Sequence, residues 1–60
     1  MKLKVDKNEL VQLLEIILET QSGENYTRAS EMLSMILLLP INIQSVTITE
    51  HEALFLSKFI

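Results

Sequence analysis

Hydrophobic and polar residues alternate one by one near both ends of the chain and recur every three to four residues in between. At the start, Met1, Leu3 and Val5 alternate with lysines, which is typical of a strand with one apolar face. The same alternation returns at Val46 and Ile48. Because the backbone of an isolated strand lacks hydrogen-bond partners, we expect the two strands to pair in one sheet.

Each alternating segment is followed directly by a helix-capping signal. Asp6 stands three residues before Glu9, and Thr49 stands three residues before Glu52. In a capping box the first side chain accepts a hydrogen bond from the backbone N–H of the Glu, and the Glu side chain reaches back to the first residue. The spacing therefore predicts one helix beginning at Lys7 and another beginning after Thr49.

The first helical pattern runs over residues 7–20 and has one wide apolar face. That face consists of Leu10, Val11, Leu13, Leu14, Ile17 and Leu18. Ile16 falls among the polar residues of the opposite face, where the core of a monomer has no use for it. The pattern ends near Gly23, a residue suited to the left-handed conformation that often follows a helix.

A second helical pattern begins near Asn25 or Thr27 and ends before Pro40, since the residue before a proline disfavours helical geometry. Its main apolar face consists of Ala29, Met32, Leu33, Ile36 and Leu37. Three further residues extend the apolar surface almost round the helix: Met35, Leu38 and Leu39. A helix that is apolar on all sides is buried on all sides, so this pattern predicts a central helix that also provides a self-association surface.

A third, shorter helical pattern follows Thr49. Its apolar residues are Ala53, Leu54, Phe55, Leu56, Phe59 and Ile60. Together the patterns predict a single, mostly helical α+β domain over residues 1–60, in the order β-α-α-β-α, with two short strands and three helices. An all-α three-helix domain with irregular ends is the alternative.

The size and composition of the chain favour a dimer. A chain of sixty residues buries only about 60% of its unfolded surface, and the absence of Cys excludes disulfides. Yet 48% of the residues are hydrophobic and the mean hydropathy is +0.31, which is more apolar surface than one small core can hide. We therefore expect a homo-oligomer, in the simplest case a two-fold dimer. The candidate oligomer or partner interface consists of Ile16, Met32, Met35, Leu38, Leu39, Phe55 and Phe59.

The sequence offers little for catalysis. His51 is the only His, and its neighbours Glu50 and Glu52 point in other directions on a helix. The Ser residues form no nucleophile motif, and Gly23, as the only Gly, cannot form a phosphate-binding loop. We therefore expect no enzyme activity, no metal and no cofactor.

The composition also indicates the cellular location of the protein and the classes of partner that it binds. Charged residues follow the N-terminal lysines where a secretory signal would be apolar, and the run over residues 35–39 is too short to span a bilayer. The net charge of −3 disfavours nucleic acid, because phosphate binding depends on Lys and Arg. We expect a cytoplasmic, non-enzymatic, small acidic protein-interaction module, an adaptor or inhibitor of a larger protein, that self-associates through its second helix and has no membrane partner.

Over residues 1–39 the expected order of strand, helix, loop and helix resembles the ribbon–helix–helix family of DNA-binding regulators. The resemblance implies a dimer whose N-terminal strands enter the major groove, with Lys2 and Lys4 facing the bases. It also places Arg28, at the start of the second helix, near phosphates. A dimeric DNA-binding transcriptional regulator is therefore the alternative function, and the acidic charge of the chain favours the protein-interaction module.

Overall fold

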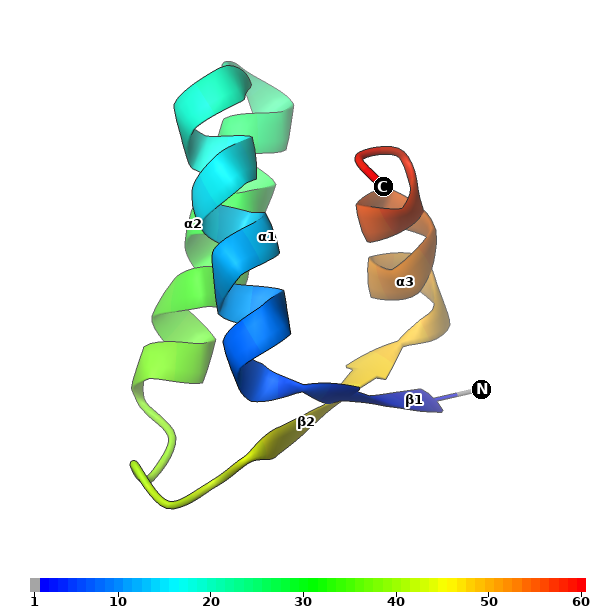
Figure 1. The fold of residues 1–60 in the computed structure, drawn as a ribbon. Helices are drawn as coiled ribbons and strands as arrows, with labels where there is room; N and C mark the ends of the chain where they lie inside the picture. Colours follow the sequence, from blue (N-terminus) through cyan, green and yellow to red (C-terminus); the bar gives the residue numbers. More distant parts are fainter. Residues whose placement is uncertain (1) are drawn as a thin grey trace.

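The computed structural model describes residues 2–60, so Met1, the first apolar residue of the expected N-terminal strand, lies outside the described residues. The elements are β1 (Lys2–Asp6), α1 (Lys7–Thr20), α2 (Glu24–Leu37), β2 (Ser45–Thr49) and α3 (Glu50–Ser57) (Figure 1). This order confirms the predicted α+β domain, mostly helical and arranged β-α-α-β-α. The all-helical alternative is wrong, because residues near both ends of the chain form a sheet.

The sheet consists of β1 and β2, which run antiparallel. Apolar residues of one strand lie opposite apolar residues of the other, in the pairs Leu3–Ile48 and Val5–Val46. On the other face Lys4 lies opposite Thr47. Because successive side chains of a strand point to opposite faces, this register turns one face of the sheet toward the core and leaves the lysine-bearing face in solvent.

The helices α1 and α2 form an antiparallel pair joined by residues 21–23 (Figure 1). Helix α1 covers the residues that the sequence predicts for it. Gly23 has the expected positive φ, 67°, but it stands immediately before α2, whereas Gln21 caps the end of α1. The special backbone conformation of Gly23 therefore serves the start of α2 rather than the end of α1.

Capping hydrogen bonds explain why α1 and α3 begin directly where the strands end. The Glu52 N–H donates to Thr49 Oγ1 at 3.2 Å, and the Thr49 N–H donates to Glu52 Oε1 at 2.7 Å, which completes the predicted capping box. At α1 the Glu9 N–H donates to Asp6 Oδ2 at 3.0 Å. Each bond satisfies a backbone donor that the first turn of a helix would otherwise leave unpaired.

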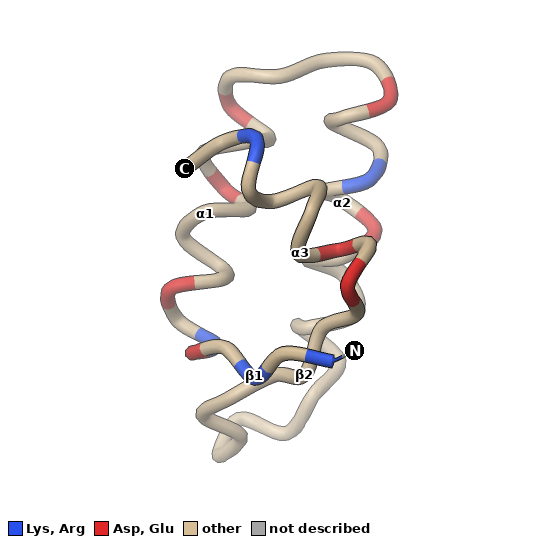
Figure 2. Tube along the Cα trace, turned by 90° about the vertical axis from the view of Figure 1, so that its right-hand side faces the viewer, with Lys and Arg blue, Asp and Glu red and all other residues tan. Residues whose placement is uncertain are grey.

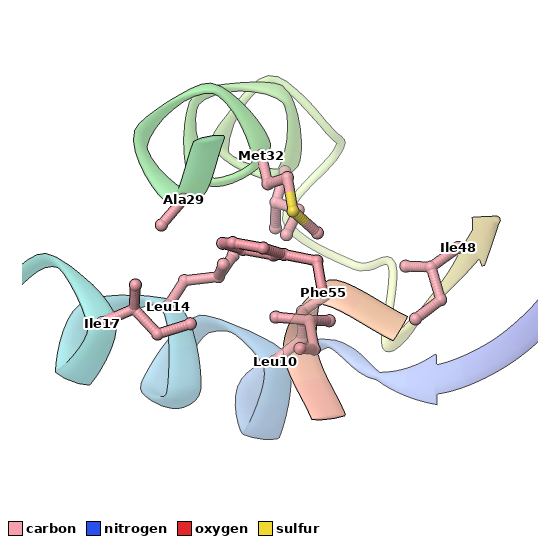
Figure 3. Packing of buried hydrophobic residues seen from close by; sticks show 9 residues of the cluster. Leu10, Leu14, Ile17, Ala29, Met32, Ile48 and Phe55 are labelled. Carbon is pink, nitrogen blue, oxygen red and sulfur yellow. The ribbon is translucent and has the colours of Figure 1, made fainter. Parts of the chain in front are cut away.

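The hydrophobic core lies between the helix pair and α3 (Figure 3). Its buried residues are Leu10, Leu14, Ile17, Ala29, Met32, Ile36, Ile48, Phe55 and Leu56. Figure 3 shows that the Phe55 side chain reaches from α3 into the space between α1 and α2. There it lies near Ala29 and Met32 on one side and Leu14 on the other, so α3 closes the open side of the helix pair through this ring.

Helix α2 is not the central, fully buried helix that its all-round apolar pattern predicts. It packs against α1 and buries only Ala29, Met32 and Ile36. Met35 and Leu37 are each 68% exposed. Among residues 2–60 no element covers the outer side of α2, so the apolar residues near its C-terminal end remain on the surface.

Candidate protein interface

Large hydrophobic residues that are exposed outnumber the hydrophobic residues that are buried in the core. Within residues 2–60, nine hydrophobic residues are buried, whereas eleven large hydrophobic residues are exposed. The exposed ones are Leu3, Ile16, Tyr26, Met35, Leu37, Leu38, Leu39, Ile41, Ile43, Leu54 and Ile60. Single apolar residues on a protein surface are ordinary, and only a contiguous group of them points to an interface.

Six of the exposed residues form one group along the chain, within residues 35–43. We call it the apolar tip, and it consists of Met35, Leu37, Leu38, Leu39, Ile41 and Ile43. Leu38 is 85% exposed and Ile41 is 96% exposed. The Ile43 N–H donates to the Pro40 C=O at 3.1 Å, which closes a turn beyond the end of α2. This turn carries the chain away from the core before β2 begins, and it holds the apolar side chains in solvent.

The apolar tip belongs to a long segment without charge. Residues 32–49 contain no Asp, Glu, Lys, Arg or His. In Figure 2 the part of the chain that joins α2 to β2 is correspondingly free of red and blue. Burial of a surface that is both apolar and uncharged has a more favourable free energy than burial of a mixed surface, because no ionic group has to be desolvated.

A groove runs from the apolar tip along the inner side of α2. A pocket of about 230 Å³ lies between the C-terminal half of α2 and β2, and its walls include Met35, Leu39 and Val46. A second pocket of about 220 Å³ lies between α2 and α3 and shares Met32, Met35 and Glu52 with the first. The two pockets share these wall residues, and we call them together the groove, whose lining is mostly apolar.

The residues predicted for the interface divide into three groups. Met35, Leu38 and Leu39 belong to the apolar tip, and Ile16 is exposed by itself on α1. Met32 and Phe55 are buried members of the core, and Phe59 is half-buried against it. Met32 and Phe55 therefore contribute to the groove only as its floor, since their side chains are already covered by the fold.

Sequence reasoning missed three members of the apolar tip. Helical periodicity places Leu37 on the main apolar face of its helix, and Ile41 and Ile43 lie outside the elements predicted above. The pattern that identifies them is composition: Leu, Ile and Met dominate residues 35–43, and residues 32–49 contain no charged residue.

The structure does not bring the candidate DNA-contacting residues together. Lys2 and Lys4 lie on the exposed face of β1, whose partner is β2 of the same chain rather than the strand of another chain. Arg28 lies on α2, with its guanidinium 5.6 Å from the centroid of the Phe55 ring. The second turn of α2 is at the end of the helix pair that points away from the sheet (Figure 1), so Arg28 and the two lysines belong to different surfaces.

His51 borders the groove together with Arg28 and Glu52. Within residues 2–60 no three His, Cys, Asp or Glu side chains form a group that could hold a metal ion. The same residues contain no helix that is both long enough and apolar enough to cross a bilayer.

Comparison with known proteins finds no match. No protein-family model matches the chain, and neither a curated protein nor a solved structure matches it significantly.

Proposed function

We propose that the chain is a non-enzymatic protein-interaction module that self-associates through the apolar tip. The observation that carries the proposal is the exposure of six large apolar residues within an uncharged segment. Full burial of one such side chain contributes roughly 1.5–3 kcal/mol. Covering the apolar tip would therefore offset a substantial part of the free energy that association costs.

The accessible surface of the single chain supports a partner of ordinary interface size. Monomeric proteins of 6.9 kDa expose about 4000 Å², whereas this chain exposes 4575 Å². The surplus of roughly 600 Å² is close to the ~800 Å² that each partner buries in a standard interface. A partner that covers the apolar tip would bury an area of this order.

The charge pattern favours a second copy as that partner. In a two-fold dimer, residues near the axis meet the same residues of the other copy, so any charge there meets a like charge. The uncharged segment over residues 32–49 avoids this repulsion.

The wider role that we propose is that of a cytoplasmic adaptor or inhibitor of a larger protein. A dimer joined at the apolar tip would leave Glu15 and Glu19, which are exposed on α1, accessible to a different protein. The absence of Cys is typical of a small intracellular domain rather than of a secreted one.

Light scattering of two matched variants tests the proposal. Leu38→Glu places a charge in the apolar tip, and Leu54→Glu makes the same change at a 60% exposed Leu on α3. At micromolar concentrations we expect a dimer for the unchanged protein and for Leu54→Glu, and a monomer for Leu38→Glu, because association would bury the new charge without a partner. An equal effect of the two substitutions on the mass would contradict the role of the apolar tip.

A further inference from the structure

One edge of the sheet is open beside the apolar tip. Strand β2 pairs with β1 on one side, and the part of the chain described here contains no third strand. The Lys7 N–H donates to the Gln44 C=O at 2.9 Å, which continues the register of the two strands. Bonded and non-bonded pairs alternate along an antiparallel ladder. Val46 therefore bonds to β1, whereas Ser45 and Thr47 direct their N–H and C=O groups away from it.

The capping box ends this open edge at Thr49. The Thr49 N–H already donates to Glu52 Oε1 at 2.7 Å, and the C=O of a residue at the N-cap position accepts the first hydrogen bond of its helix. The groups available on the outer edge of β2 are therefore the N–H and C=O of Ser45 and of Thr47.

The two outer edges of the sheet differ in charge. By the same alternation, the outer edge of β1 presents the backbone of Lys2, Lys4 and Asp6. Charged residues, and Lys above all, are typical of edges that are protected from pairing with another chain. The outer edge of β2 lies within the uncharged segment and has no such protection.

The groove lies along β2. Val46, Thr47 and Ile48 all line the pocket of about 230 Å³, although successive side chains of a strand point to opposite faces. The pocket therefore borders the backbone of β2 as well as its apolar face. Helix α2 forms the facing wall with Met35 and Leu39.

We propose that β2 pairs antiparallel with β2 of a second copy, so that the dimer contains one four-stranded sheet. This pairing rests on the proposed self-association and adds a backbone contact at the strand that follows the apolar tip. With the two-fold axis at Val46, Ser45 of each chain lies opposite Thr47 of the other. Each such pair exchanges two backbone hydrogen bonds. The open N–H and C=O groups of Ser45 and Thr47 therefore all find partners in both copies.

With the two-fold axis at a neighbouring residue of β2, fewer of the open backbone N–H and C=O groups would find hydrogen-bond partners. An axis at Thr47 would place Ser45 opposite Thr49, whose N–H is bonded to Glu52. An axis at Ser45 would instead place Thr47 opposite a residue of the turn, Ile43, whose N–H is bonded to the Pro40 C=O at 3.1 Å. The axis at Val46 also brings two apolar side chains into contact, next to the apolar walls of the groove.

Two proline variants test which edge is used. Thr47→Pro removes the N–H from the open edge of β2, and Lys4→Pro makes the matching change on β1. Lys4 and Thr47 face each other in a non-bonded pair, so neither variant loses a hydrogen bond between β1 and β2. We expect Thr47→Pro to be a monomer and Lys4→Pro to remain a dimer, with the far-ultraviolet circular dichroism of the unchanged protein. The opposite result would overturn the proposal in favour of pairing through β1.

Cysteine cross-linking keeps the proposal testable if a proline disturbs the sheet. The chain contains no Cys, so Val46→Cys introduces a single thiol at the proposed axis, where directly opposed Cβ atoms lie about 4.5–5.5 Å apart. Mild oxidation should link this variant into a covalent dimer, whereas Val5→Cys, at the position opposite Val46 in the sheet, should remain unlinked.

The results of these experiments distinguish a failure of the β2 pairing from a failure of the proposed self-association. If the unchanged protein is a dimer but Thr47→Pro is also a dimer and Val46→Cys links no faster than Val5→Cys, then the edge pairing is wrong and self-association through the apolar tip stands. If the unchanged protein is a monomer, both proposals fail.

Discussion

Phe55 is the residue through which α3 is held to the helix pair. Its side chain is 3% exposed, and its ring packs edge-to-face on Phe59 with the centroids 5.3 Å apart. Phe55→Ala should lower the free energy of unfolding by about 3–5 kcal/mol, because it removes these contacts and leaves a cavity. Urea denaturation at one fixed protein concentration measures this change. Phe59→Ala, at a half-buried site, should cost less, and an equal loss in the two variants would show that Phe55 has no special place in the core.

A substitution at Gly23 tests the backbone conformation of the turn between α1 and α2 without altering side-chain packing. Its φ and ψ are 67° and −136°, and a Cβ added there would meet no heavy atom within 4 Å. Gly23→Ala should therefore destabilise the protein by about 1–3 kcal/mol through backbone strain alone. Thermal unfolding measures the loss, and Ser22→Ala serves as the neighbouring control. A neutral Gly23→Ala would mean that the turn between α1 and α2 has a different backbone.

At the scale of elements, the short helix α3 depends on its cap. Thr49→Ala removes the acceptor for the Glu52 N–H, and we expect the free energy of unfolding to fall by about 1 kcal/mol. Glu52→Gln retains an oxygen that can accept from the Thr49 N–H, so its cost should be smaller. Urea denaturation monitored by circular dichroism compares the two variants, and a larger loss for Glu52→Gln would contradict this account of the cap.

The elements that the sequence predicts best are those with local chemical signals. Residues 7–20 form the expected helix because Asp6 caps its start. The end of α2 was less predictable: the helix stops at Leu37, and the next residues make tighter bonds, from the Leu38 N–H to Met35 and from the Leu39 N–H to Ile36. Pro40 predicts that the helix ends before residue 40, but it does not predict the exact end at Leu37 or the exposure of the residues that follow.

At the scale of the whole molecule, the sequence indicates that apolar surface is in surplus but not where it lies. Helical periodicity assigns Leu37 and Met32 to the same face, yet Leu37 is exposed and Met32 is buried. The difference arises from the docking of α1 and α3 against α2, which no property of α2 alone determines. The same tertiary packing draws Phe55 into the core, although the sequence treats it as a candidate for the interface.

The central claim is that the apolar tip joins two copies of the chain, and the solution mass of the unchanged protein tests it most directly. Light scattering over a wide range of micromolar concentrations should give twice the chain mass of 6.9 kDa, with dissociation only on dilution. A mass of one chain at every concentration, from a protein with the expected helical circular dichroism, would contradict the claim.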